Sequence, residues 1–199
     1  MKKLMMIAVM AVCCLTANAQ KMRHDAGSIT IQPMVGFSTG TWRGETSGTT
    51  STSNEARVGL AIGAEGEYYT STEWLSISAG VMYMQQGWKF KDYSETTKLD
   101  YINIPILANF YVAKGFALKI GVQPGFVVSA KEGSVDVKDH CKSFNFAIPV
   151  GLSYEFKNGI TLDLRGAASL TRVDKFDSDD VKWYNDGGML TIGYKFELK

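Results

Sequence analysis

The sequence has little of what disulfide-rich secreted domains and imidazole-dependent enzymes use. It contains three cysteines in 199 residues, and two of them, Cys13 and Cys14, lie in an apolar N-terminal stretch. Cys141 is then alone in the rest of the chain, which excludes an internal disulfide framework there. Only two histidines occur, His24 and His140. We interpret Cys141 as a residue near a strand end, with pairing between chains as the alternative.

An excess of charge of one sign is also missing. The chain has 21 basic and 20 acidic residues, a formal net charge of +1. A nucleic-acid partner would require a basic patch or stripe, so none is predicted. After the N-terminal stretch, no segment approaches the roughly 18 consecutive apolar residues of a membrane-spanning helix, which excludes that kind of span.

The N-terminus has the pattern of a secretion signal. Lys2 and Lys3 form the charged region, residues 4–17 the apolar core, and Ala17-Asn18-Ala19 the small-residue cleavage motif. The apolar core is shorter than the roughly 20 residues that a spanning helix needs. We therefore expect cleavage before Gln20.

Cleavage there gives a signal peptide at 1–19 and leaves 20–199 as a single domain. The alternative is a lipoprotein anchored through Cys13 or Cys14. Lipid attachment favours a small residue before the cysteine, whereas Val12 and Cys13 occupy those positions. The cleaved signal peptide is therefore the favoured interpretation.

The body of the chain alternates apolar with polar or very small residues at a period of two. Residues two apart lie on one face of a strand, so each such stretch predicts a strand with one apolar face. The clearest apolar set is Ile102, Ile104, Ile106, Ala108, Phe110 and Val112, and a stronger one runs through 144–156. The predicted strands are 28–39, 56–69, 73–88, 99–113, 115–129, 142–156, 159–171 and 188–198.

The connections between these strands alternate in length. Short turns at 70–72, 114 and 157–158 separate long connections at 40–55, 89–98, 130–141 and 172–187. Short turns at one end and long loops at the other are typical of outer-membrane barrels. The sequence therefore predicts an all-β, eight-stranded antiparallel up-and-down transmembrane β-barrel in the cell outer membrane, with both termini in the periplasm.

The alternative is an exported soluble β-barrel that carries a small apolar ligand. It would turn Ile104 and Phe146 inward and would stay soluble without detergent. The opposite face of the strands decides between the two, because it is rich in Gly, Ala and Ser. A water-facing surface does not need such small residues, whereas an eight-stranded interior only just holds side chains. The apolar face is therefore predicted to point outward, into lipid.

The predicted inner face carries opposite charges in balance. Unpaired charge in a narrow interior would cost several kcal/mol, so balance indicates pairing. We interpret these residues as a structural charge network, and not as the lining of a pore, since pores use about 16 to 18 strands. The network consists of Arg57, Glu65, Glu67, Lys119, Glu155, Asp163, Arg165 and Lys195.

Aromatic and proline residues add two further expectations. Aromatics on the apolar face gather near both strand ends, as in the interface girdles of outer-membrane barrels. Pro33, Pro105, Pro124 and Pro149 all fall within predicted strands, where each removes a ladder hydrogen bond. We expect bulges there, or strands that project beyond the membrane. The girdle residues are Tyr68, Phe110, Phe116, Tyr154, Phe156, Tyr194 and Phe196 at the short-turn end, and Phe37, Tyr83, Phe126 and Phe144 at the other.

Two loops contain residue types that can support catalysis or metal binding. His140 lies between Asp139 and Cys141, but adjacent residues in an extended chain point apart, which disfavours a catalytic pair. The segment 174–186 holds several carboxylates that could bind calcium, yet its spacing matches no calcium-loop pattern. A solvated acidic loop is favoured. No catalytic residue, cofactor or metal is predicted, and His24 is expected to be a solvated tail residue.

Three segments resemble a known family. They are LDYINIPILANFY at 99–111, IGVQPGF at 120–126 and FAIPVGLSYEF at 146–156. With these, the chain resembles the PorT-like small outer-membrane β-barrel proteins, related in architecture to OmpA/OmpX-type barrels. The resemblance implies an eight-stranded barrel in a Gram-negative outer membrane and, for one branch, a link to protein secretion.

In that family the last strand usually closes on an aromatic residue that the barrel-assembly machinery reads. Here Tyr194, Phe196 and Leu198 supply the pattern, and Lys199 departs from it. We therefore expect a non-enzymatic structural or interaction protein, whose partners are outer-membrane lipid, the barrel-assembly machinery and an unknown molecule at the long loops. The candidate contact residues are Trp42, Arg43, Trp88, Tyr93, Trp183 and Tyr184.

Overall fold

The computed structural model describes residues 22–46, 49–51, 54–90, 96–133, 135–138, 142–172 and 182–198. The predicted signal peptide lies outside these residues. So do Tyr93, His140, Cys141 and the greater part of the acidic segment at 174–186, and the expectations placed on them stay predictions.

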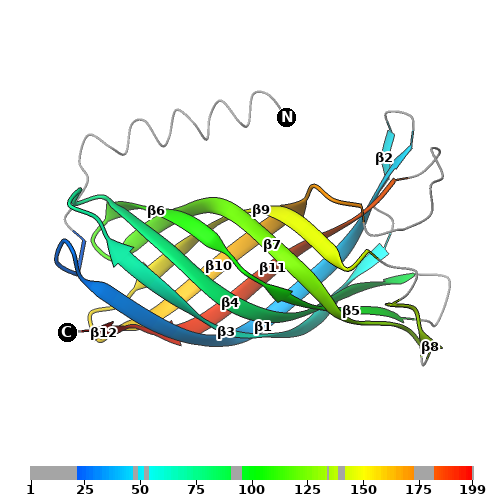
Figure 1. Ribbon diagram of the computed structural model, residues 1–199, viewed down its shortest axis with the longest axis horizontal. Helices are drawn as coiled ribbons and strands as arrows, with labels where there is room; N and C mark the ends of the chain where they lie inside the picture. The colour runs from blue at the N-terminus through cyan, green and yellow to red at the C-terminus, as the bar shows by residue number, and fades with distance from the viewer. Residues whose placement is uncertain are drawn as a thin grey trace.

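The strands form one antiparallel sheet that closes on itself (Figure 1). β1 pairs with β3 on one side and with β11 on the other, which leaves the long strands without a free edge. Eight positions surround the axis, because β5 and β6 share one and β11 and β12 share another, so the predicted eight-stranded fold is confirmed. Within the described residues, no helix is long and apolar enough to cross a membrane. The strands are β1 (Ile29–Thr46), β2 (Thr49–Ser51), β3 (Asn54–Tyr69), β4 (Leu75–Phe90), β5 (Thr96–Asn103), β6 (Ile106–Ala113), β7 (Phe116–Glu132), β8 (Val135–Asp136), β9 (Phe144–Glu155), β10 (Ile160–Ser169), β11 (Lys182–Tyr194) and β12 (Phe196–Leu198).

Apolar side chains point outward from the barrel. In β1, Val35 and Phe37 are exposed whereas Met34 and Ser38 are buried, and the other long strands alternate in the same way. Ile104 is 36% exposed on the outer face, so the soluble carrier with an apolar interior is wrong. A period-two pattern has only two possible orientations, and the small inner-face residues identified the right one.

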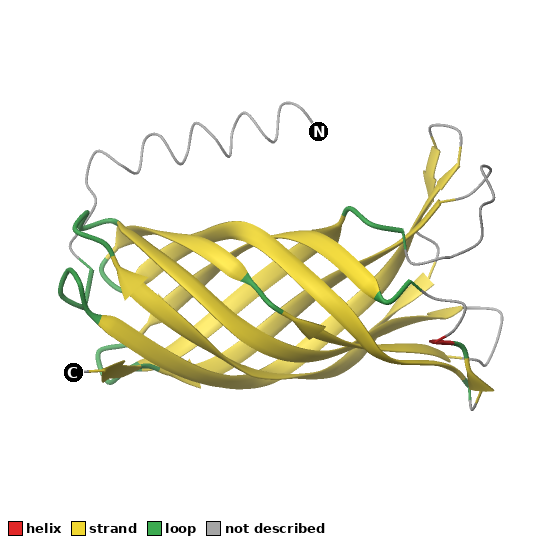
Figure 2. Ribbon diagram, in the orientation of Figure 1, coloured by secondary structure: helices red, strands yellow, loops and turns green. Residues whose placement is uncertain are grey.

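The two ends of the barrel differ, as the lengths of the predicted connections indicate. Turns follow β3, β6 and β9 at one end, and the described parts of both termini lie at that same end (Figures 1 and 2). At the other end, the strands continue past the predicted limits. β1 runs to Thr46 and β11 begins at Lys182, because residues 40–45 pair with 182–187 in a continuous ladder. Backbone pairing there outlasts the apolar alternation on which the prediction relied.

The prolines do not cause the predicted bulges. Pro105 separates β5 from β6, yet Asn103 faces Gly125 and Ile106 faces Val122, which is an unbroken register. The Pro105 carbonyl still accepts a hydrogen bond from the Gly80 amide, at 3.1 Å. Each proline therefore removes one donor without adding a residue. The register shifts lie between Ala56 and Ala61, Asp100 and Tyr101, and Tyr111 and Ala113.

Aromatic residues cluster on the outer face at both ends. Tyr154 and Phe156 have ring centroids 4.9 Å apart at the short-turn end, and Phe126 and Phe144 lie 5.6 Å apart at the other. Trp74, which was not among the predicted girdle residues, stacks on Phe110 at 6.0 Å. This arrangement is the one expected of side chains that meet the two interfaces of a bilayer.

Candidate functional site

A compact ionic cluster crosses the middle of the interior. Arg165 of β10 reaches across to Glu65 of β3, with Nη2 2.7 Å from Oε2, and its Nε lies 2.6 Å from Asp163 Oδ1. Lys119 of β7 lies 2.7 Å from Asp163 and 3.5 Å from Glu65. All four side chains are nearly inaccessible to solvent. Two cations thus neutralise two carboxylates on three sides of the lumen, which ties distant strands together.

The small residues of the inner face make room for this cluster. A Cβ atom at Gly80 would lie 2.5 Å from the Glu65 Cγ and 2.3 Å from the Ala64 carbonyl oxygen. Any side chain at that position would therefore displace either β3 or the Glu65 carboxylate. Glycine there is required by the ion pair that its neighbour makes.

A second ionic cluster lies closer to the short-turn end. Lys195 Nζ is 2.7 Å from Glu67 Oε2 and 3.2 Å from Glu155 Oε2. It also donates to the Tyr69 hydroxyl at 2.9 Å, and the Tyr111 hydroxyl donates to Glu67 Oε1 at 2.6 Å. Tyr69 and Tyr111 were missed in the sequence, although each continues the inward alternation of its strand by one step. Their hydroxyls provide hydrogen-bond partners for the Glu67 carboxylate and the Lys195 ammonium, which are buried in a surrounding of low dielectric constant.

The segment before β1 closes the short-turn mouth. Met22 is 4% exposed and packs with Tyr69, Tyr111 and Ala117. Its amide donates to the Glu73 carbonyl at 3.3 Å. Residues 22–28 therefore form a cap, and no period-two pattern was available to predict it.

His24 belongs to this cap and is not the solvated tail residue that was expected. Its Nε2 lies 3.0 Å from Glu155 and its Nδ1 3.1 Å from Glu197, while its ring centroid is 4.8 Å from that of Tyr69. Burial lowers the pKa of His24, but the hydrogen bond and negative charge of Glu155 outweigh it, so the pKa is raised above its usual value.

The eighth residue of the predicted charge network, Arg57, stands apart from both clusters. Its Nη1 donates to the Gln86 carbonyl at 2.6 Å and lies 3.8 Å from Asp100. All eight predicted residues face inward, and the structure adds Asp100 and His24 to their partners. The pairing of particular residues depends on strand register, which the sequence pattern does not give.

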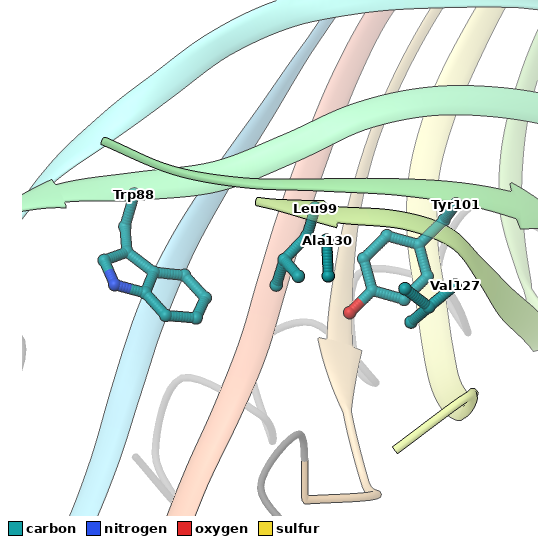
Figure 3. Close-up of a cluster of buried hydrophobic side chains, with 5 residues drawn as sticks. All are labelled: Trp88, Leu99, Tyr101, Val127 and Ala130. Atoms are coloured by element: carbon teal, nitrogen blue, oxygen red, sulfur yellow. The ribbon is translucent and has the colours of Figure 1, made fainter. Parts of the chain in front are cut away.

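Toward the long loops, the interior combines two apolar clusters with buried polar side chains such as Gln86 and Asn185. Met34, Met82, Met84 and Met189 pack around Ala61. A second apolar cluster lies nearer to the long loops (Figure 3). It consists of Trp88, Leu99, Tyr101, Val127 and Ala130.

Trp88 was predicted to be a loop contact residue, and this prediction is wrong. The side chain is 6% exposed and lies inside the barrel. It continues the inward series of β4, in which Met82, Met84 and Gln86 precede it at intervals of two. Trp88 is the last residue of the predicted strand 73–88, and β4 continues past it to Phe90.

Three of the remaining candidate contacts, Arg43, Trp183 and Tyr184, lie where β1 meets β11. Arg43 Nε lies 2.7 Å from Asp186 Oδ2, and the guanidinium sits 4.4 Å from the centroid of the Tyr184 ring. Arg43 thus contacts Tyr184 within the protein itself, and it also pairs with Asp186 of the acidic segment. Trp183 is half-buried beside them. The side chains of Trp42 and Tyr93 lie outside the described part of the structure.

Neither metal binding nor an open channel is evident in the part of the chain that the structure describes. It holds no group of three or more His, Cys, Asp or Glu side chains placed to bind a metal ion. A cavity between Met84, Gln123, Arg165 and Met189 has a volume of about 10 Å³, which is about the space of one water molecule.

A match to a family model agrees with the fold. Residues 18–175 match the family model described as outer membrane protein beta-barrel domain. A search of curated proteins found no match to the sequence. Similar solved structures include Ail, the attachment invasion locus protein of Yersinia pestis, at 14% identity and TM-score 0.48, covering 86% of this chain and 100% of Ail.

Two more solved structures are similar to this chain. OprG of Pseudomonas aeruginosa shares 13% identity at TM-score 0.46, with 87% of this chain and 97% of OprG covered. Neisserial surface protein A shares 15% identity at TM-score 0.48, with 84% of this chain and 97% of that protein covered. The family model does not single out the PorT-like branch, which stays a hypothesis. The model covers most of the chain, and so this protein belongs to the outer membrane protein beta-barrel domain family and resides in the outer membrane.

Proposed function

We propose that this barrel is a non-enzymatic structural or interaction protein, and that its contacts with other molecules are made at the long-loop end. The observation that carries the proposal is the filled interior. Two ionic clusters, two apolar clusters and the cap occupy the lumen from one mouth to the other. A barrel of this kind presents only its ends and its lipid face to partners.

The long-loop end offers a surface suited to contacts. A hollow of about 610 Å³ there is lined by Lys142, Phe144, Leu170, Arg172 and Tyr184 among others. Leu170 is 56% exposed and Phe144 44% exposed. Aromatic and arginine side chains dominate the binding energy of many protein interfaces. We call these five residues the rim surface.

Site-specific crosslinking in living cells tests the proposal. A photoreactive phenylalanine analogue would replace Phe144 or Leu170 on the rim surface, and Val150, on the outer face at mid-height, would serve as the matched control. Adducts with a protein or surface polymer at the rim positions, and not at the control, would support the proposal. Equal labelling at all three positions, or no adduct at the rim, would contradict it.

The secretion role that the PorT-like resemblance implies is part of this proposal. An accessory function in protein secretion rests on the family resemblance, and a rim adduct with a secretion component would support it. An adduct with the barrel-assembly machinery would instead report insertion of the barrel. Pulse labelling separates the two, because adducts made during insertion disappear once the barrel is folded.

A further inference from the structure

The short-turn mouth contains a second hollow, on the outer side of the cap. Its volume is about 500 Å³, within the range of small-molecule sites. It lies between the cap, the turns after β6 and β9, and the end of the last strands. Cationic side chains dominate it: Arg23, Lys114 and Lys157 line it together with His24, Glu155 and Glu197.

Arg23 is held in place at this hollow. Its Nε donates to the main-chain carbonyl of Glu155 at 3.0 Å. Its guanidinium also lies against Gly115, where a Cβ atom would come within 2.7 Å of Nε. Gly115 has a φ of +82°, which suits glycine, so the turn and the arginine fit each other. The rest of the guanidinium fork has no acidic partner within the described residues.

Lys114 and Lys157 are exposed in the two turns, and neither forms an ion pair with a described residue. Cations inside the barrel behave differently. Lys119, Arg165 and Lys195 each lie within 3.5 Å of at least one carboxylate oxygen. The three cations at the mouth therefore stand out as positive charges without a counter-ion among the residues that the structure describes.

The two carboxylates of the hollow are already engaged. Glu155 and Glu197 both hydrogen-bond to His24, and Glu155 also pairs with Lys195. Their charge is therefore directed at His24 and at the ionic cluster behind it. The open side of the hollow keeps the excess positive charge of Arg23, Lys114 and Lys157.

We propose that this hollow binds a ligand with two or more carboxylate or phosphate groups. Arg23 would present a planar fork to one anionic group, and the two lysines would act as point charges for the others. The proposal is independent of the role of the rim surface. Two sources can supply such a ligand, a soluble multivalent anion or the phosphate headgroups of the adjoining membrane leaflet.

The first experiment uses the full chain in nanodiscs of zwitterionic phosphatidylcholine. Citrate is titrated at low ionic strength by isothermal titration calorimetry into the wild type, Arg23→Gln and the double variant Lys114→Gln/Lys157→Gln. Lys98→Gln, an exposed lysine at the opposite end, is the matched control. Each lost charged hydrogen bond is expected to weaken binding by about tenfold or more, with Lys98→Gln unchanged. The unheated and boiled forms on a detergent gel show that each variant is folded.

The second arm identifies the source. The same four proteins are reconstituted with cardiolipin, which carries two phosphates, and no citrate, and the lipid retained after detergent exchange is counted. Saturable citrate binding that the mouth variants lose supports a soluble ligand. Cardiolipin retention lost in the same variants, without citrate binding, supports a headgroup. The proposal is overturned if neither ligand binds, or if Lys98→Gln weakens binding as much as the mouth variants.

Discussion

The two halves of the barrel interior are filled by different chemistry. Toward the short turns, Glu65, Lys119 and Arg165 tie strands across the lumen by ion pairs. Toward the long loops, the methionine cluster and the cluster around Trp88 pack beside neutral polar side chains such as Gln86 and Asn185. An interior this narrow must be filled, but it does not prescribe how. The two halves should therefore respond differently to the loss of an ion-pair partner and to the loss of side-chain volume.

Arg165→Met should be the most damaging change, because it leaves the Glu65 and Asp163 carboxylates buried with too little positive charge. Breaking a buried ion pair typically costs about 3–5 kcal/mol of unfolding free energy. Urea titration of the folded protein in detergent micelles, followed by tryptophan fluorescence, measures this loss. Arg165→Met combined with Glu65→Gln should recover part of it, and a loss below about 1 kcal/mol would argue against the ionic half as described.

Trp88→Ala tests the apolar half by removing volume. The side chain is buried among Leu99, Tyr101 and Val127, so the variant should lose about 3 kcal/mol through the cavity that it leaves. Trp74→Ala is the control, since Trp74 is 38% exposed on the outer surface, and should lose clearly less. The same urea titration, with far-UV circular dichroism as its signal, compares the two. Equal losses would mean that Trp88 does not pack as the structure places it.

The cap should respond to pH through His24. The raised pKa means that the pairing of His24 with Glu155 contributes its full stability below the unfolded value of about 6.5. That contribution is lost as pH rises through the higher folded pKa. We expect the wild type to lose stability as pH rises above about 6.5, and His24→Ala to lose about 1 kcal/mol at pH 6 while varying less with pH. Parallel pH profiles for the two proteins would exclude His24 as the source.

Met189→Leu should have the smallest effect and sharpens the contrast between the halves. It nearly conserves volume in an apolar cluster, so the loss should stay below about 1.5 kcal/mol. Asp163→Asn conserves volume equally well in the ionic half, but it removes a charge that Lys119 and Arg165 share. Its loss should therefore be larger than that of Met189→Leu. Similar losses in the two variants would mean that charge does not distinguish the halves.

The fold could be predicted because alternation reports directly on strand faces. Ile102 to Val112 on one side, and Glu65, Lys119 and Arg165 on the other, fell on the faces that the pattern assigned. Prediction stopped at features that alternation does not encode. The cap around Met22 has no period, and the partner of each charge depends on register between strands far apart in the chain, such as Glu65 and Arg165.

The errors have a common physical origin. Trp88 was placed among the contact residues because it ends the predicted strand 73–88 beside a long loop, and bulges were expected at prolines because a closed barrel offers no free edge for a lost hydrogen bond. In both cases the register continues beyond the residue. β4 runs on to Phe90, and β5 and β6 keep one register against β7 on either side of Pro105. Backbone pairing in a closed barrel is cooperative, since each strand is held on both sides.

Planar-bilayer recording tests the central claim most directly, because that claim is a lumen closed from the cap to the Trp88 cluster. Purified wild-type protein, shown to be folded by its heat-dependent gel mobility, would be inserted into a bilayer in 1 M salt solution. We expect no conductance steps from the wild-type protein. Steady, discrete conductance steps from the wild-type protein would contradict it and would show that ions cross the interior.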